Sequence, residues 1–427
     1  MPIAATTVTT AIPNTNAPNA NVSAAYQKAW RKVAGAVVQG LNFAVEETGY
    51  MDGLPKESMP VGRENLLPVD LNEEAGIASI PEGGYEARPT SVGLEETFVG
   101  TVQFNGRFNI PLLVKYLDAG NANQLERMLK LQGMKKVQAF AATKGDYFWG
   151  SSSAILALTA NAVSGTSSTV QLTAAYGNAG ITAAGYVTKL FKVGDYVALL
   201  SGGALVANAI GLITARDTTA GTIAVQWNGT VASTPAGAQL VKANSMENTT
   251  LAGTDYNRGY VGIQDGLLAP SVHALTHPNW MPAGVSSAAG RFTGTKLRLA
   301  DDEIANQGGG RVDQILIDQA VYRDMISLER AAVRFNDPFA LEIDGDVKAK
   351  GRKFFKSRRC VPTWVLCMDR TALYSWFQTE TPSAPASYSD GKEYIDVNAM
   401  VFRIEQVGNL VWRNRRKTFL YTNQAQS

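Results

Sequence analysis

The chain has 427 residues, and its 39 Lys and Arg residues nearly balance its 37 Asp and Glu residues, which leaves a formal net charge of +2. This length suggests two to four domains, since a domain usually has about 100–200 residues. Hydrophobic residues make up 45% of the chain and charged residues 18%, as is typical of a globular protein. The near-neutral balance argues against a dedicated nucleic-acid-binding protein, which usually carries a large basic excess.

Side chains suited to metal or thiol chemistry are scarce, because the chain has only two Cys and two His residues. Cys360 and Cys367 are too widely spaced for a CxxC motif and too few for a disulfide framework. His273 and His277 have the i, i+4 spacing of a helical zinc site, but proline residues on both sides interrupt a helix there. We therefore expect no metal site, no cofactor and no catalytic centre.

The segment before Ser23 has neither a basic region nor a continuous apolar run, so we expect a mobile arm and not a secretory signal. Ser23 is a suitable N-cap for an amphipathic helix whose apolar face carries Tyr26, Trp30, Val33 and Val37. The longest uncharged run, residues 147–188, is rich in Ser, Thr, Gly and Asn, so no transmembrane helix is expected.

The charges are sorted by segment. The acidic segment, residues 64–98, has eight acidic residues and one basic residue, Arg88, whereas residues 147–246 contain only six charged residues. The basic run, residues 348–359, has seven basic residues: Lys348, Lys350, Arg352, Lys353, Lys356, Arg358 and Arg359. A second basic cluster contains Arg413, Arg415, Arg416 and Lys417. One charge run usually marks a solvated face, but opposite runs in one chain suggest that copies of the chain attract each other.

In the first part of the chain, the acidic segment contains several Pro and Gly residues, so we expect an extended two-stranded excursion there. A helix is expected to start at Asn121 or Asn123 and to run toward Phe140. Apolar residues surround most of this predicted helix, so it should be packed on more than one side.

The low-charge segment alternates at the period of a β-strand, with Ile223, Val225 and Trp227 on one face. We expect a small β-barrel or sandwich inserted between helical segments. Beyond Gly266 the pattern is α/β, with helices near residues 297–304 and 319–332 and strands in residues 308–318, 361–369 and 372–377. Residues 394–422 are expected to form a long β-segment with a bulge near Ala399 and a turn at Gly408–Asn409.

The order of these parts resembles the major capsid proteins of tailed phages, which have the Hong Kong 97 phage type of fold. EGGYEARPT resembles the tip of the extended loop of that family, and VDQILID followed by a helix resembles its axial domain. The resemblance implies an α+β fold with an N-terminal arm and helix (1–45), an extended β-loop (46–110), a peripheral domain with a spine helix (111–150 and 392–427), an inserted β-rich domain (151–262) and an axial α/β domain (263–391).

In function, the resemblance implies a structural protein and not an enzyme. Such a protein assembles into pentamers and hexamers that form an icosahedral phage head around packaged double-stranded DNA. The expected location is the virion capsid, assembled in the host cytoplasm, with no membrane contact. The implied partners are other copies of the chain, a separate scaffolding protein, a portal, a decoration protein and the packaged DNA, which is bound non-specifically.

In the family, the extended loop of one subunit lies across the peripheral domain of its neighbour. The resemblance therefore implies a subunit interface that contains Glu73, Glu74, Glu86, Arg88, Arg127, Lys130, Arg413, Arg415 and Arg416. Some members of the family lock the shell through a covalent bond from a loop lysine, but residues 64–110 contain no Lys, so we expect a noncovalent shell. The basic run either faces DNA or forms a capsomer loop that acidic neighbours balance.

Two alternatives remain open from the sequence. An encapsulin-type nanocompartment has the same shell fold around a cargo enzyme, although the long N-terminal arm and the large insertion favour a phage capsid. A bacterial surface or carbohydrate-binding β-protein is suggested by the middle of the chain, which is rich in Thr and Gly. The absence of a signal peptide and the α/β segment count against this second alternative.

Overall fold

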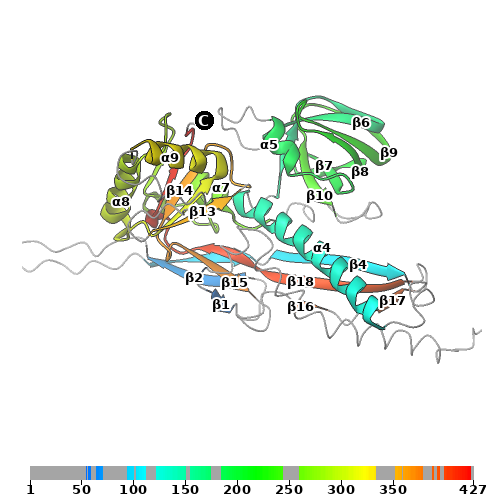
Figure 1. The fold of residues 1–427 in the computed structure, drawn as a ribbon, viewed down its shortest axis with the longest axis horizontal. Coiled ribbons are helices and arrows are strands. Elements are labelled where there is room, and N and C mark those ends of the chain that lie inside the picture. The colour runs from blue at the N-terminus through cyan, green and yellow to red at the C-terminus, as the bar shows by residue number, and fades with distance from the viewer. Residues whose placement is uncertain are drawn as a thin grey trace, which may run out of the picture.

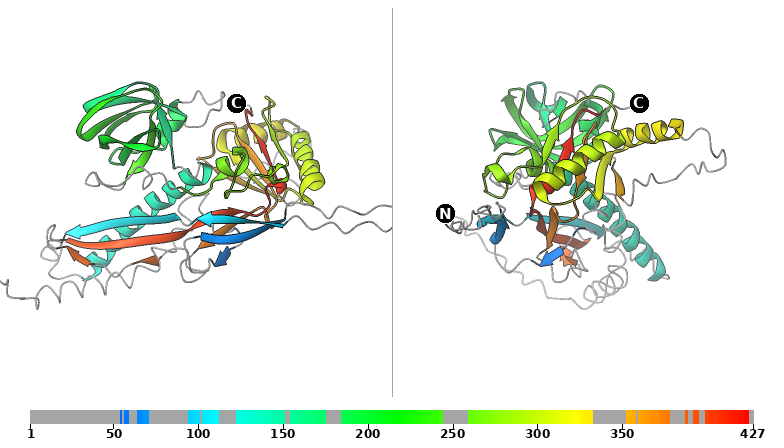
Figure 2. Two further views of the ribbon diagram at one scale, coloured as in Figure 1. Left: turned by 180° about the vertical axis from the view of Figure 1, so that it is seen from behind. Right: turned by 90° about the vertical axis from the view of Figure 1, so that its left-hand side faces the viewer.

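The computed structural model describes residues 54, 56–58, 64–70, 94–100, 102–111, 122–150, 154–174, 184–243, 259–332, 352–357, 359–377, 387–388, 392–394 and 399–424. The helix expected around Tyr26–Val37 lies outside these residues. Three bodies are visible in Figure 1: a long sheet with a helix across it, an α/β body at one end of that sheet, and a separate barrel. The view from behind shows the same separation of the barrel from the α/β body (Figure 2, left).

The long sheet is organised around β18 (Ala399–Trp412). Its first ten residues pair antiparallel with β4 (Val102–Pro111), and Phe108 stacks on the opposite Phe402 with ring centroids 5.3 Å apart. The last five residues of β18 pair with β15 (Leu373–Phe377), so β18 exchanges one neighbour for another along its length. The shorter strands of this sheet are β1 (Lys56–Ser58), β16 (Ser387–Tyr388) and β17 (Lys392–Tyr394).

The turn expected at Gly408–Asn409 is wrong, because β18 continues through both residues. Gly408 has a paired strand on each side, and the Asn409 side chain supports the crossing point: its amide donates to the Gly100 carbonyl (2.7 Å) and its oxygen accepts from the Val261 N–H (3.2 Å). Among the described residues, the bulge expected near Ala399 is not found, since the register with β4 is unbroken from Ala399 to Gly408, and residues 395–398 lie outside the description. Tertiary partners have overridden local turn propensity here.

Two strands and a long helix precede the barrel. β2 (Glu64–Asp70) and β3 (Leu94–Gly100) pair antiparallel over their full length, as expected for the two ends of the acidic segment. α4 (Ala122–Trp149) has 28 residues and extends nine residues beyond the expected end at Phe140, with a length of about 42 Å. Phe140 packs on Phe104 of β4 with ring centroids 6.2 Å apart, which fixes α4 across the sheet.

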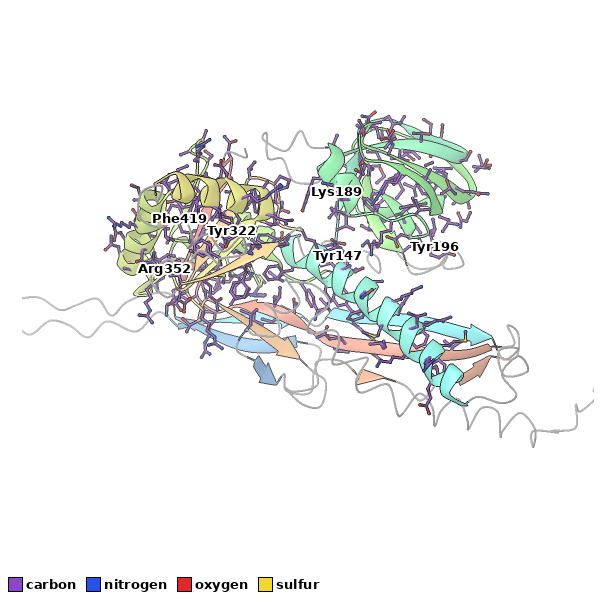
Figure 3. The ribbon with its side chains drawn as sticks, viewed as in Figure 1. Tyr147, Lys189, Tyr196, Tyr322, Arg352 and Phe419 are labelled. Atoms are coloured by element: carbon purple, nitrogen blue, oxygen red, sulfur yellow. The ribbon has the colours of Figure 1, made fainter. Side chains whose placement is uncertain are left out.

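The α/β body has a five-stranded sheet with helices packed on it. The sheet order is β11 (Gly284–Ser286), β19 (Thr418–Tyr421), β14 (Val365–Met368), β12 (Gln314–Asp318) and β13 (Lys353–Ser357). α9 (Gln319–Ala332) has the predicted bounds, and α8 (Gly294–Gly308) is longer than predicted at both ends. Buried residues of both helices meet the sheet in one core, near the labelled Tyr322 and Phe419 in Figure 3.

The inserted segment forms a closed barrel in the strand order β10 (Gln239–Ala243), β5 (Ala157–Thr159), β6 (Val163–Ala174), β9 (Thr222–Thr234), β8 (Ala204–Asp217) and β7 (Tyr196–Ser201). A short helix, α5 (Ala184–Lys189), packs on it. Ile223, Val225 and Trp227 are all buried, as their alternation predicted, and the Trp227 indole donates to Ser168 Oγ (2.7 Å). Side chains therefore fill the barrel interior.

The segment between the barrel and the α/β body, residues 259–275, is fixed to the end of β18. It contains α7 (Ile263–Leu268). The Trp412 indole donates to the Val261 carbonyl (3.1 Å), and the Trp412 backbone N–H donates to Nε2 of His273 (3.1 Å). The Trp412 ring also lies so close to Gly266 that a Cβ atom there would be 2.0 Å from it.

We predict that Gly266→Ala destabilises the chain by about 1–3 kcal/mol, because the added methyl group has no space beside the Trp412 ring. Gly294→Ala is the matched control, since nothing lies within 4 Å of the Cβ position at the start of α8. The free energy of unfolding in urea measures both variants. Equal stability of Gly266→Ala and the wild type would contradict the packing at β18.

His273 predicts a dependence of stability on pH. Burial, followed by the charge of Arg415, lowers the pKa of His273 to about 3 from 6.5, so the unfolded state binds a proton between these values and the folded state does not. The free energy of unfolding should therefore fall as the pH drops below 6.5, by up to about 1.4 kcal/mol per pH unit from this residue. Urea unfolding at pH 7.5 to 4.5 should show a shallower dependence for His273→Gln than for the wild type or for His277→Gln, and equal slopes would refute the assignment.

Candidate subunit interface

The outward face of α4 carries apolar and basic side chains together. Leu131 is 57% exposed and Met134 is 39% exposed, three residues apart, and the exposed side chains of Arg127, Lys130 and Lys135 lie on either side of them in the sequence. Large apolar side chains grouped on a surface often mark a contact with another molecule. The sequence predicted that α4 is packed on several sides. Among the described residues of one chain, however, nothing covers this face of α4.

Arg413, Arg415 and Arg416 are placed differently from one another. Arg413 is exposed and Arg416 is half-buried, whereas Arg415 is fully buried in η4 (Arg415–Lys417). The Arg415 guanidinium donates from Nε to the Gly266 carbonyl (2.6 Å) and from Nη2 to the Ala269 carbonyl (2.8 Å). Burial lowers the pKa of Arg415 to about 10. Arg415 therefore holds the 259–275 segment, which differs from the expectation that it faces another subunit.

The two basic sets do not form one surface. Arg127 and Lys130 lie in the first turns of α4, near the end of the long sheet where Pro111 pairs with Ala399 (Figure 1). η4 follows the opposite end of β18 and contacts α8 of the α/β body. The resemblance implied that these residues share one interface, but the length of α4 separates them.

Arg413 and Arg416 belong to a larger basic corner, which also contains Arg311, Arg370 and Lys417. Hydrogen bonds join its segments: the Asp369 N–H donates to the Lys417 carbonyl (3.0 Å), and the Arg311 N–H donates to the Asp369 side chain at Oδ2 (3.2 Å). Burial and the nearby Asp369 charge raise the pKa of Asp313, whose carboxylate accepts from the Arg370 N–H (2.9 Å). Sequence reasoning missed Arg311 and Arg370, because they stand in unrelated segments with no local charge run.

The described side chains of the basic run contact their own chain. Arg352 forms an ion pair with Asp301 of α8, Arg359 forms one with Asp146 of α4, and Lys356 Nζ lies 4.8 Å from the centre of the Tyr322 ring. Lys353 lies in β13, and its side chain is outside the description. Lys348, Lys350 and Arg358 also lie outside the described residues. These intrachain contacts leave the described part of the run less available to phosphate groups than its sequence suggests.

The loop side of the predicted interface, which consists of Glu73, Glu74, Glu86 and Arg88, lies outside the described residues. The two strands at the base of this loop, β2 and β3, are described, and Val69 of β2 and Val99 of β3 are fully buried. The base of the acidic segment is therefore anchored in the apolar core of its own chain.

His273 and His277 each accept a hydrogen bond from a backbone N–H group. His273 accepts a backbone hydrogen bond, as described above, and Nδ1 of His277 accepts from the Asn279 N–H (3.1 Å) at the start of a 3₁₀ turn. In the part of the chain that the structure describes, no three His, Cys, Asp or Glu side chains are grouped to hold a metal ion. Among the same residues, no helix is long and apolar enough to span a membrane.

The chain was compared with protein-family models, curated sequences and solved structures. No protein-family model matches the chain, and no curated protein sequence matches it. Among solved structures, the capsid asymmetric unit of cyanophage A-1(L) matches with a TM-score of 0.50 and 9% sequence identity, over 89% of this chain and 93% of the other.

Weaker structural matches include Gordonia phage Cozz (TM-score 0.41, 10% identity, 88% of this chain and 85% of the other). Another is the procapsid of satellite phage P4 with its size determination protein (TM-score 0.42, 8% identity, 92% and 91%). At these scores the two matches add no weight. The match to the cyanophage subunit, over nearly the whole of both chains, shows that this chain has a phage capsid fold of the Hong Kong 97 type.

Proposed function

We propose that the chain is a major capsid protein, which assembles into pentamers and hexamers of an icosahedral shell around packaged double-stranded DNA. The observation that carries this proposal is the capsid fold shared with the cyanophage subunit over 89% of the chain. In this role the chain is structural and not catalytic, and its location is the virion after assembly in the host cytoplasm. A separate scaffolding protein, a portal and a decoration protein are its proposed partners besides DNA.

The outward face of α4 is the proposed docking site for the acidic segment of a neighbouring copy. Its three exposed cations face solvent in one chain, and the acidic segment has eight acidic residues against one basic residue. Each exposed ion pair gives only about 0.2–1 kcal/mol. Burying Leu131 and Met134 adds apolar stabilisation in proportion to the area removed from water. Such individually weak contacts favour a shell in which misplaced subunits can leave again.

The basic corner at η4 is proposed as a second contact. It lies at the other end of the long sheet from the first turns of α4, so a subunit would meet neighbours or DNA at both ends (Figure 1). The basic run is proposed mainly as a capsomer loop, because its described side chains already pair with Asp301, Tyr322 and Asp146.

The proposed function predicts megadalton shells. Size-exclusion chromatography and negative-stain microscopy of the purified chain should show closed particles, and particles from infected cells should contain DNA. A denaturing gel should show one monomer band, because residues 64–110 supply no lysine for a cross-link. A monodisperse monomer would overturn the proposal, whereas shells that enclose a protein cargo without nucleic acid would indicate an encapsulin-type compartment.

The proposed interface predicts a charge-swap result. Reversing Glu73, Glu74 and Glu86 to Lys should block shell formation without unfolding the subunit, because the loop would then carry the same charge as the α4 face. Adding Arg127→Glu and Lys130→Glu to that variant should restore particles.

The matched control for this swap is Lys189→Glu with Lys192→Glu, which changes two exposed lysines of the barrel. Particle yield is counted by electron microscopy, and circular dichroism reports folding. Normal particles from the triple Lys variant would refute the docking of the acidic segment on the outward face of α4.

A further inference from the structure

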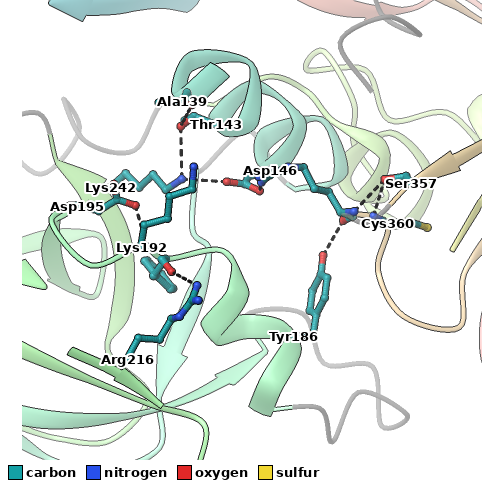
Figure 4. Close-up of polar contacts among 12 residues, drawn as sticks. Ala139, Thr143, Asp146, Tyr186, Lys192, Asp195, Arg216, Lys242, Ser357 and Cys360 are labelled. Carbon is teal, nitrogen blue, oxygen red and sulfur yellow. Dashed lines mark hydrogen bonds and ion pairs between the residues drawn. The ribbon is translucent and has the colours of Figure 1, made fainter. Parts of the chain in front are cut away.

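One carboxylate lies where three parts of the molecule meet. Asp146, in the last turn of α4, has a side chain with no exposed area. Its Oδ2 accepts from Nζ of Lys242 in β10 (2.9 Å), and its Oδ1 accepts from the guanidinium of Arg359 (Figure 4). Lys242 and Arg359 belong to the barrel and to the loop before β14, so both ion pairs of Asp146 connect α4 to a different body.

The barrel reaches the same loop by a second route. The Tyr186 hydroxyl of α5 donates to the Arg359 carbonyl (2.8 Å) (Figure 4). Lys242 also lies 3.4 Å from Oγ1 of Thr143, one turn before Asp146. The junction is therefore a connected polar network, and the Asp146 carboxylate is its only anion bonded to two cations among the described residues.

The loop that Arg359 begins is tied to the α/β body. The Cys360 N–H donates to Ser357 Oγ (2.9 Å), and its thiol lies 3.7 Å from the Trp364 carbonyl. Thr363 holds the C-terminal segment, since its carbonyl accepts from the Gln424 N–H (3.0 Å). Cys360 is 1% exposed, so its thiol reports whether this loop is closed.

The barrel is a self-contained body. Its strands form a closed ring with a filled interior, and its first and last strands, β5 and β10, are adjacent in that ring. The two connections to the rest of the chain therefore leave from neighbouring strands. A body attached in this way can change its tilt without losing its own hydrogen bonds.

We propose that Asp146 is a latch that seats the barrel and closes the 359–364 loop at the same time. Without the carboxylate, Arg359 and Lys242 lose their shared ion-pair partner, and only the charge of Asp195 still favours the Lys242 ammonium. The two half-buried cations are then more stable when the junction opens to water. Barrel seating and loop closure are thus coupled, and by linkage a contact that seats the barrel also favours the closed loop. This coupling is a property of the single chain and does not depend on the proposed shell.

The test uses the full chain with two independent readouts of Asp146→Asn. For the barrel, spin labels at Lys189→Cys and Arg298→Cys, on exposed sites of α5 and α8 in a background without native cysteines, give the distance between the two bodies. For the loop, alkylation in a Cys367→Ala background gives the rate for Cys360. The wild type should show one narrow distribution of the distance between the labels and slow alkylation of Cys360. Labelled chains are diluted into unlabelled ones, so that only distances within one chain are measured.

In Asp146→Asn we expect a broadened distance distribution and a rise in the Cys360 rate of at least about tenfold, equivalent to about 1.4 kcal/mol. Asp302→Asn, an exposed carboxylate of α8, should change neither readout. The proposal is overturned if Asp146→Asn changes neither readout or only one of them, because the latch would then not be shared.

A second variant keeps the test decisive if Asp146→Asn does not fold. Lys242→Met combined with Tyr186→Phe removes contacts of the barrel and leaves the pair of Asp146 and Arg359 intact. The distance should broaden and the Cys360 rate should rise with it, because a contact that seats the barrel also favours the closed loop; a broadened distance with an unchanged Cys360 rate would show that the two are not coupled. A distance as narrow as in the wild type would show that these contacts do not seat the barrel.

Discussion

The contact between the end of β18 and the 259–275 segment is the constraint on which the architecture depends. β18 has β4 beside its first part and β15 beside its last part, so it joins the long sheet to the chain that enters the α/β body. Trp412 and Arg415 then bind the backbone of the segment that returns from the barrel. Because Gly266 has no Cβ, the indole can reach this backbone, and burial of Arg415 is offset by two carbonyl partners.

Local periodicity was enough to predict elements whose burial pattern is regular. The bounds of α9 and the inward face of Ile223, Val225 and Trp227 follow directly from apolar spacing. The path of β18 through Gly408–Asn409 could not be predicted in this way, because it depends on partners at Gly100 and Val261 that are distant in sequence. Closure of the barrel likewise depends on the pairing of β10 with β5, which no local pattern specifies.

The same limit applies to the candidate interface. The resemblance placed Arg127, Lys130 and Arg413 in one subunit interface, but it could not show that the length of α4 separates the first two from the third. A run also says nothing about burial. Arg415 is adjacent to Arg416 in the sequence, yet it is fully buried and its guanidinium donates to two backbone carbonyls of another segment. Side-chain role is decided by the fold around each residue, and charge alone is a weak guide to it.

The near-zero net charge has a physical explanation in where the charged side chains lie. Cations are used in two ways: some, such as Arg352 and Arg359, pair with carboxylates inside the chain, and others, such as Arg127 and Lys130, face solvent on α4. The 64–98 segment carries the opposite charge, with eight acidic residues and one basic residue. If the α4 face docks the acidic segment of a neighbouring copy, as proposed above, each copy carries both halves of the contact and has an electrostatic reason to assemble with itself.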